Sequence, residues 1–144
     1  MEQKDKELLL KDLSARLPYN CKVFYEYVDD LDGKTYGYSL TLNTWCIDEF
    51  IANKVVIKPY LRPMSSMTEE EKEELSHLLP KDWSAEIDNF NNLYFDMCSS
   101  VFIEIDVFLN IIDWLNAHHF DYCELIKKGL ALEAPDGMYN LEKK

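Results

Sequence analysis

The chain has 144 residues, of which 47% are hydrophobic. This size and composition predict a single globular domain (1–144) and exclude an intrinsically disordered chain. Its 27 acidic and 15 basic residues give a net charge of −12, with only two arginines, Arg16 and Arg62. Such a charge disfavours direct binding to nucleic acids or to anionic membranes. It would suit a basic partner, although solubility alone also explains it.

The four cysteines, Cys21, Cys46, Cys98 and Cys123, are far apart and form no CxxC pair. Zinc-finger and thioredoxin-type sites therefore have no support. The first residues are charged, and no run approaches the roughly 18 apolar residues of a membrane helix. We therefore expect reduced thiols, a cytoplasmic location and no membrane association.

The first half of the chain predicts a helix followed by a small antiparallel sheet. Leucines recur at helical spacing from Glu2 to Leu17, and Pro18 ends the pattern. Cys21–Val28 and Thr35–Leu42 are typical of two strands, joined by a turn that contains Asp32-Gly33. Alternation in the second strand predicts one apolar face, formed by Tyr36, Tyr38, Leu40 and Leu42.

The next segments are less regular. Residues 43–53 fit either a short helix or a turn. Val55–Lys58 predicts a third strand, which Pro59 and Pro63 confine to an edge or an end. Thr68 opens a helix with the capping-box pattern Thr68-Glu-Glu-Glu71.

The second half predicts further helices. One starts at Asp82 or Ser84; its apolar residues at helical spacing are Trp83, Ile87, Phe90, Tyr94 and Met97. Another spans Ile103–His118, although Val101–Ile103 also fits a strand; its apolar face comprises Ile105, Phe108, Ile112 and Leu115. A short helix from Asp121 to Gly129 and a strand at Leu130–Leu132 complete the pattern. The fold class is therefore α+β, with a β-hairpin and one or two further strands packed against about four helices.

His118, His119 and Asp121 are the densest group of candidate catalytic residues, and Cys123 follows them. Imidazole and carboxylate are metal ligands and acid–base groups. However, adjacent histidines on a helix point about 100° apart, and the i, i+4 spacing of zinc proteases is absent. The simpler interpretation is a histidine at a helix end and Asp121 as a helix cap. We assign no metal site and no cofactor.

A second candidate is the connector from Lys58 to Met64, where two prolines hold Tyr60 and Arg62. Tyrosine and arginine are favoured anchors at protein interfaces. The alternative is a structural corner in which Arg62 pairs with a nearby acid. Trp114 and Tyr122 are candidate binding residues in the later segment.

Three blocks resemble a family of short hypothetical proteins of gut bacteria that are often encoded among phage-like genes. The blocks are KPYLRPMSSMTEEE (58–71), DWLNAHHFDY (113–122) and GLALEAPDGMY (129–139), about a quarter of the chain. The resemblance implies a bacterial, prophage-linked setting and carries no catalytic residue across. Members of the family often have Arg-Gly after the aromatic residue at position 122. This chain has Cys123-Glu124 there, which weakens the case for a shared thiol site.

The leading hypothesis is a non-enzymatic accessory protein that binds another protein; a homodimer is also compatible with exposed aromatic residues. One alternative is a small hydrolase, metal-dependent or based on His118, His119 and Asp121. Another is an acidic mimic of nucleic acid, which would place carboxylates in a basic groove of a partner.

Overall fold

The computed structural model describes residues 1–79, 83–89, 92–97 and 105–139. The chain divides into two compact units: Met1–Leu61 with Glu124–Lys144 (unit 1), and Arg62–Cys123 (unit 2). The α+β class is confirmed, with helices, a four-stranded mixed sheet and a two-stranded sheet. The prediction of a single domain stays a prediction.

Unit 1 contains the four-stranded sheet, in the order β2-β1-β3-β6. Its strands are β1 (Lys22–Val28), β2 (Thr35–Thr41), β3 (Val55–Leu61) and β6 (Leu132–Glu133). β1 is antiparallel to β2 and β3, whereas β6 is parallel to the end of β3. β6 pairs only with Tyr60 and Leu61. β3 runs through Pro59 to Leu61, past its predicted end at Lys58, and it lies between β1 and β6 rather than at the edge of the sheet. At Pro59 it has a described partner on the β1 side only, which agrees with the expected position of a proline.

The β1–β2 hairpin forms where the sequence predicted it. The Asp29 carboxylate accepts a hydrogen bond from the Leu31 N–H at 2.7 Å, and Gly33 adopts a φ of 70°. Such a loop requires residues whose short side chains accept hydrogen bonds, such as aspartate, and glycines that adopt a positive φ. The loop thus fixes the register, in which Tyr25 faces Tyr38 and Tyr27 faces Tyr36.

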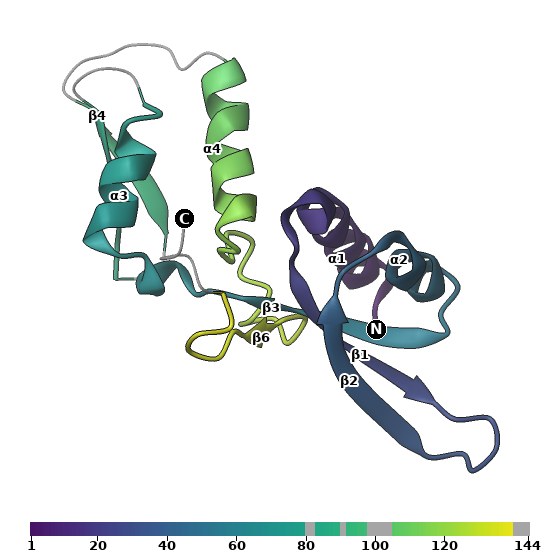
Figure 1. The fold of residues 1–144 in the computed structure, drawn as a ribbon. Helices are drawn as coiled ribbons and strands as arrows, with labels where there is room; N and C mark the ends of the chain where they lie inside the picture. The colour runs from purple at the N-terminus through teal and green to yellow at the C-terminus, as the bar shows by residue number, and fades with distance from the viewer. Residues whose placement is uncertain (80–82, 90–91, 98–104, 140–144) are drawn as a thin grey trace. The chain divides into compact units, whose positions relative to one another are not determined.

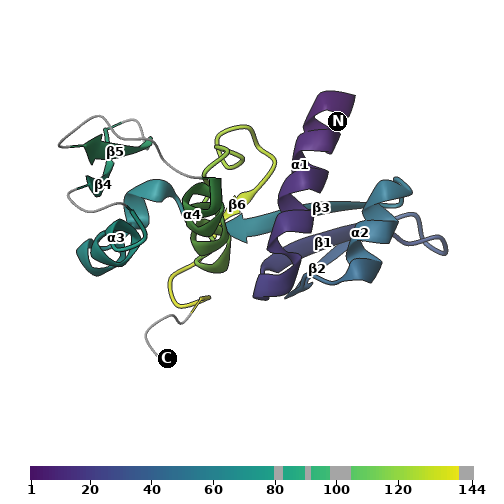
Figure 2. The same ribbon diagram turned by 90° about the horizontal axis from the view of Figure 1, so that it is seen from above.

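Two helices, α1 (Gln3–Arg16) and α2 (Thr44–Ile51), lie on the same face of this sheet (Figures 1 and 2). A short 3-10 turn, Leu17–Tyr19, follows α1. Asn43 caps α2 by accepting a hydrogen bond from the Cys46 N–H at 3.0 Å. This cap decides the ambiguity of residues 43–53 in favour of a helix.

The buried side of α1 contains a charged pair. Leu9 and Leu13 are fully buried, as the leucine spacing predicted, but Asp12 and Arg16 are buried beside them. The Arg16 guanidinium donates to both Asp12 carboxylate oxygens, at 2.7 and 3.1 Å. A buried ion pair of this kind is tolerated because the two opposite charges compensate each other through the hydrogen bonds that the guanidinium donates to the carboxylate.

The C-terminal part of unit 1 is a turn and a short strand, so the predicted helix from Asp121 to Gly129 is wrong. Glu124 has a φ of 57°, which interrupts a right-handed helix, and the residues after it form hydrogen-bonded turns instead of a helix, among them a turn from Ile126 to Gly129. Gly129 closes that turn with a φ of 77°, the left-handed conformation that was expected of it. The predicted strand at Leu130–Leu132 is displaced to Leu132–Glu133.

Tyr139 connects the C-terminal segment to the sheet by hydrogen bonds. Its hydroxyl donates to the Tyr60 carbonyl and accepts from the Lys22 N–H, both at 2.8 Å. Burial, with the nearby Cys21 thiol, raises the pKa of Tyr139 far above its usual range. The hydroxyl thus stays protonated and joins two strands of the sheet.

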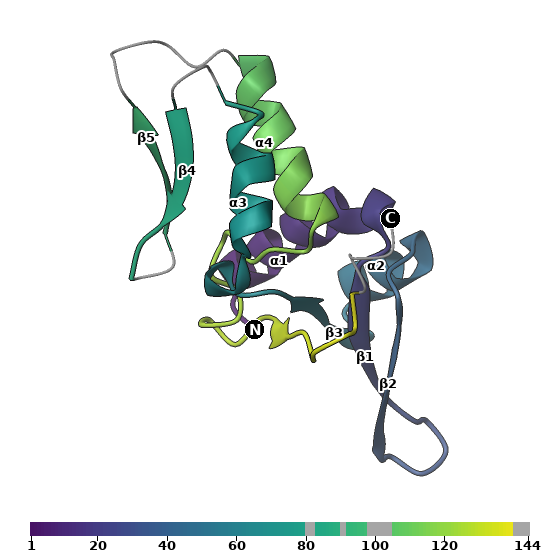
Figure 3. The same cartoon turned by 60° about the vertical axis from the view of Figure 1, so that its left-hand side comes forward.

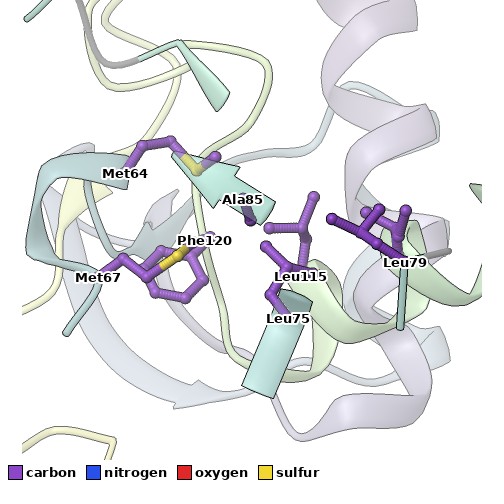
Figure 4. Close-up of a cluster of buried hydrophobic side chains, with 8 residues drawn as sticks. Met64, Met67, Leu75, Leu79, Ala85, Leu115 and Phe120 are labelled. Carbon is purple, nitrogen blue, oxygen red and sulfur yellow. The ribbon is translucent and has the colours of Figure 1, made fainter. Parts of the chain in front are cut away.

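Unit 2 is built from two helices and a hairpin. The helices are α3 (Glu69–Ser76) and α4 (Ile105–Ala117), and the strands are β4 (Trp83–Ile87) and β5 (Leu93–Met97). Figure 3 shows the β4–β5 hairpin beside α3 and α4 next to α3. Buried side chains of these elements and of the segments that connect them form one hydrophobic cluster (Figure 4), comprising Met64, Met67, Leu75, Leu79, Ala85, Ile111, Leu115 and Phe120.

The helix predicted from Asp82 or Ser84 to Met97 is wrong, because this segment contains the β4–β5 hairpin. Ala85 faces Phe95 and Ile87 faces Leu93, a period of two that coexists with the helical spacing. The Asp88 carboxylate accepts a hydrogen bond from the Asn92 N–H at 2.9 Å and orders the turn. Phe90 lies outside the described residues.

Helix α4 confirms the predicted helix over its described residues; its predicted apolar face is right for Leu115 and Ile112, which pack into the cluster, and wrong for Ile105 and Phe108. Ile111 and Leu115 are buried, whereas Ile105 and Phe108 are 76% and 52% exposed. The apolar residues nearly encircle this helix, so the sequence did not determine which side is buried. The segment Val101–Ile103 lies outside the described residues, as does Cys98.

The helices in the described part of the chain are too short or too polar to span a membrane.

Candidate functional site

The Arg62 end of the first candidate segment and the second candidate segment come together in unit 2. The Arg62 N–H donates to the His119 carbonyl at 2.7 Å, and the Asp121 N–H donates to the Arg62 carbonyl at 2.9 Å. Arg62 and Phe120 form a parallel bridge, and the guanidinium lies 4.2 Å from the centre of the Phe120 ring. We call this arrangement the Arg62 corner.

The Arg62 guanidinium is held within the chain. Its two terminal nitrogens donate to the two carboxylate oxygens of Glu71, each at 2.8 Å. Glu71 also accepts from the Thr68 N–H at 3.0 Å, so the capping box and the ion pair share one carboxylate. Burial alone would raise the pKa of Glu71, but the hydrogen bonds from Arg62 and Thr68 outweigh it and lower the pKa. This geometry is that of a structural corner.

His118 lies at the end of α4 in a small polar cluster. Its Nε2 is 3.4 Å from a Glu74 carboxylate oxygen, which also accepts from the Trp114 indole N–H at 2.7 Å. Its ring stacks on Trp114, with the ring centres 4.0 Å apart. Nδ1 is 2.9 Å from the Trp114 carbonyl, where it can only donate.

The surroundings of His119 differ from those of His118. His119 has a φ of 65° and is 5% exposed, and its carbonyl is the acceptor of Arg62. Asp121 is also buried, and its backbone N–H is bound to Arg62. A surface hollow of about 350 Å³ on α3 is lined by Glu70, Glu73, Glu74 and His77, and none of the three predicted catalytic residues lines it.

The four predicted binding residues are divided between the units. Trp114 stacks on His118 and Phe120, and the Tyr122 hydroxyl donates to the Asn116 amide oxygen at 2.8 Å. Tyr60 belongs to unit 1, where its hydroxyl lies 3.1 Å from that of Ser39. Tyr60 and Arg62 therefore belong to different units, although only one residue separates them in the sequence.

A third group of residues, which the sequence did not single out, gathers on unit 1. Five aromatic rings contact one another across β1, β2 and the start of α2, with centres 5.2 to 6.3 Å apart. Tyr36, Tyr38 and Trp45 are 41%, 45% and 50% exposed. We call this group the hairpin aromatic surface; its members are Tyr25, Tyr27, Tyr36, Tyr38 and Trp45.

Carboxylates adjoin this surface. The Tyr36 hydroxyl donates to the Asp32 carboxylate, a bond that lowers the pKa of Asp32 and raises the pKa of Tyr36. Burial, followed by the Glu49 carboxylate, raises the pKa of Tyr25. Aromatic faces beside negative charge attract cations, because ring quadrupoles and carboxylates act with the same sign.

The sequence contained a signal for this surface. The alternation of Tyr36, Tyr38, Leu40 and Leu42 correctly predicted that these residues share a face, which was interpreted as a core face. Leu42 is buried, but the two tyrosines are nearly half exposed. The change from leucine to tyrosine towards the turn marks where the hairpin extends past the helices (Figure 1). Tyrosine suits such positions because one end is apolar and the other polar.

Comparison of the chain with protein-family models, with curated proteins and with solved structures finds no match. Within residues 1–79, 83–89, 92–97 and 105–139, three or more His, Cys, Asp or Glu side chains are nowhere grouped so as to hold a metal ion.

Proposed function

We propose that the chain is a non-enzymatic accessory protein that acts by binding another protein through the hairpin aromatic surface. The observation that carries this proposal is the exposure of Tyr36, Tyr38 and Trp45 in one continuous group of rings. Clustered aromatic side chains are the commonest energetic anchors of protein interfaces. The phage-associated resemblance and a bacterial cytoplasmic setting are compatible with this role.

The packing of the surface also suits binding. Tyr38 contacts the rings of Tyr25 and Tyr27, and Tyr25 stacks on Trp45 at 5.2 Å. Rings held by their neighbours lose little conformational entropy when a partner covers them. The exposed area is therefore preorganised, which favours affinity.

Arg62 contributes in a different way. Its guanidinium is occupied by Glu71 and lies over Phe120, so it stabilises the corner rather than presenting free donors. The proposed contact surface in unit 2 around Trp114 and Tyr122 stays a prediction. Unit 2 thus supplies the comparison residue for the experiment on unit 1.

The test is a quantitative pull-down from lysate of the native host with three tagged baits. The first is the wild type, and the second carries Tyr36→Thr and Tyr38→Thr, which keep strand propensity but remove both rings. The third carries Tyr94→Thr; Tyr94 lies on β5 of unit 2 and is 48% exposed, so it is a matched control.

We expect a stoichiometric, salt-sensitive partner on the wild-type and Tyr94→Thr baits, and at least about tenfold less on the double variant. Circular dichroism and thermal unfolding must show that each bait is folded. Equal recovery of the partner on all three baits would overturn the hairpin aromatic surface as the contact site.

A small hydrolase is a second candidate, and the contact between Glu74 and His118 is the observation that favours it. A carboxylate that orients an imidazole is a common acid–base arrangement. This candidate predicts that the purified protein hydrolyses ester or phosphoester probes and that His118→Gln abolishes the activity. Metal analysis of the preparation separates a metal-dependent from a metal-free version; no turnover of either probe class, with or without added metal ions, would count against it.

A further inference from the structure

We propose that the outer edge of β2 binds an extended segment of the partner protein as an added strand, with basic side chains at alternate positions over Tyr36 and Tyr38. This inference rests on the proposed function and names the chemistry of the partner. Adding a strand to a free sheet edge is a common way in which proteins bind peptides, because the peptide backbone supplies the hydrogen bonds.

The pattern of hydrogen bonds between β1 and β2 shows which backbone N–H and C=O groups of β2 point away from β1. The Leu42 N–H donates to the Cys21 carbonyl at 2.8 Å, and the Asp29 N–H donates to the Lys34 carbonyl at 2.9 Å. Bonded pairs alternate along an antiparallel ladder, so Tyr36, Tyr38 and Leu40 bond towards β1. The N–H and C=O groups that point away from β1 are therefore those of Thr35, Gly37, Ser39 and Thr41.

The two edges of the sheet differ in composition. Within the described residues, no strand pairs with the outer side of β2, which has seven residues and neither a charge nor a proline. On the opposite side, the stretch of β3 that β6 leaves open carries Lys58 and Pro59. Charged residues and proline are the usual devices that prevent a free edge from pairing. The absence of both on β2 marks it as the edge able to pair.

Side-chain register then specifies the occupant. Tyr36 and Tyr38 point to the same face as Tyr25 and Tyr27, so alternate residues of an added strand would lie beside these rings. Arginine or lysine there would stack on the tyrosines and approach the Asp32 carboxylate. The net charge of −12 favours a basic segment over an acidic one and over a second copy of this chain.

The probe is an acetylated and amidated eight-residue peptide of alternating arginine and threonine, titrated into the ¹⁵N-labelled full chain. One control peptide has glutamate in place of arginine, and another has the arginine sequence with alternate backbone nitrogens methylated. The expected result is a set of amide shifts, with slowed hydrogen exchange, at Thr35, Gly37, Ser39 and Thr41. The glutamate and N-methylated peptides should bind at least about tenfold more weakly, the factor that corresponds to about 1.4 kcal/mol.

A pair of variants tests the same edge from the protein side. Ser39→Pro removes an outward N–H without removing a bond to β1, whereas Ser39→Ala keeps that N–H and removes only the hydroxyl near Tyr60. Binding should survive Ser39→Ala and be lost in Ser39→Pro. If Ser39→Pro fails to fold, the N-methylated peptide still decides the question, because it leaves the protein unchanged.

Four outcomes would overturn the proposal. Amide shifts spread over the whole acidic surface, together with equal binding of the N-methylated peptide, would show that the protein attracts the peptide by its charge alone. No binding of the arginine peptide at millimolar concentration would exclude a basic strand. Concentration-dependent self-association of the free chain, abolished by Ser39→Pro, would identify a second copy as the occupant. A partner retained by the Ser39→Pro bait but lost by the Tyr36→Thr, Tyr38→Thr bait would leave the protein-binding function standing and reject strand addition.

Discussion

Each unit contains one arginine, and each arginine makes a two-pronged ion pair, but the two pairs are placed differently. In unit 1, Arg16 and Asp12 lie four residues apart on α1, and their side chains are 0% and 1% exposed. In unit 2, Arg62 and Glu71 join a corner to the start of α3, and their side chains are 15% and 14% exposed. Water therefore reaches the second pair and not the first.

This difference shows how an ion pair contributes to stability when it is buried and when it is partly exposed. The buried pair strongly opposes the loss of either partner, because the remaining charge has no access to solvent. The partly exposed pair loses less when it is broken, but it organises three segments at once: the corner, the capping box and the loop at His118 and His119. Both arginines therefore make ion pairs within their own unit, and the proposed binding surface consists of aromatic residues instead.

The largest expected effect is from Asp12→Ala, which leaves Arg16 charged and buried. We expect a loss of about 3–5 kcal/mol in the free energy of unfolding, measured by urea denaturation. Asp12→Leu combined with Arg16→Met should recover most of that stability, because an apolar pair carries no desolvation penalty. A single variant that loses less than about 1 kcal/mol would contradict the burial of the pair.

Breaking the second pair should cost less. Glu71→Ala removes the acceptor of Arg62 and of the Thr68 N–H, and we expect it to lower the free energy of unfolding by about 1.5–3 kcal/mol. Glu73→Ala, an exposed change on the same helix, should stay within about 0.5 kcal/mol of wild type. Equal effects of the two substitutions would show that the Arg62 corner adds no stability.

Tyr139→Phe tests the hydrogen bonds that connect the C-terminal segment of unit 1 to its sheet. The change removes one hydroxyl and leaves the Lys22 N–H and the Tyr60 carbonyl without that partner. We expect a loss of about 1–2 kcal/mol. Hydrogen exchange should report it as faster exchange of the Lys22 amide; unchanged protection of that amide would contradict the bond.

Acid should weaken the Arg62 corner in a defined direction. The pKa of Glu71 in the folded chain lies below its unfolded value, so its contribution to stability is complete above the unfolded pKa and is lost as the pH falls through the folded pKa. The stability difference between wild type and Glu71→Gln should therefore shrink from pH 7 towards pH 3. A constant difference across that range, measured by urea denaturation, would count against the ion pair.

The smallest effect concerns the thiols, which again differ between the units. Burial raises the pKa of Cys21 to about 11, so only about one in a thousand of these thiols is ionised at pH 8. Cys123 of unit 2 is partly exposed. Iodoacetamide should modify Cys123 well before Cys21 in the native protein, as followed by mass spectrometry of tryptic peptides. Equal rates would contradict the burial of Cys21.

The sequence predicted elements wherever a local signal was decisive. The hairpin loop with Gly33, the capping box at Thr68 and the leucine spacing of α1 each rest on contacts between neighbours in the chain. The β4–β5 hairpin was missed because its apolar residues fit two periods at once, and the turn at Asp88 decided between them. The exposed face of α4 was missed because only tertiary packing selects which side of an apolar helix is buried.

For the candidate sites too, the sequence predicted local contacts but not contacts between distant segments. The sequence correctly offered an ion pair of Arg62 with a nearby acid, but it did not show that Arg62 meets His119, Phe120 and Asp121. Pairing between distant segments is set by the fold rather than by local pattern. For the hairpin aromatic surface, the sequence showed which residues share a face, and only the structure showed that α1 and α2 leave part of that face open (Figures 1 and 3).

The central claim is that the hairpin aromatic surface binds a protein partner, and the three-bait pull-down from host lysate tests it most directly. The account predicts one stoichiometric partner that is retained by wild type and by Tyr94→Thr and is depleted at least about tenfold on the folded Tyr36→Thr, Tyr38→Thr bait. A partner recovered equally on all three baits, or no partner on any of them, would contradict it.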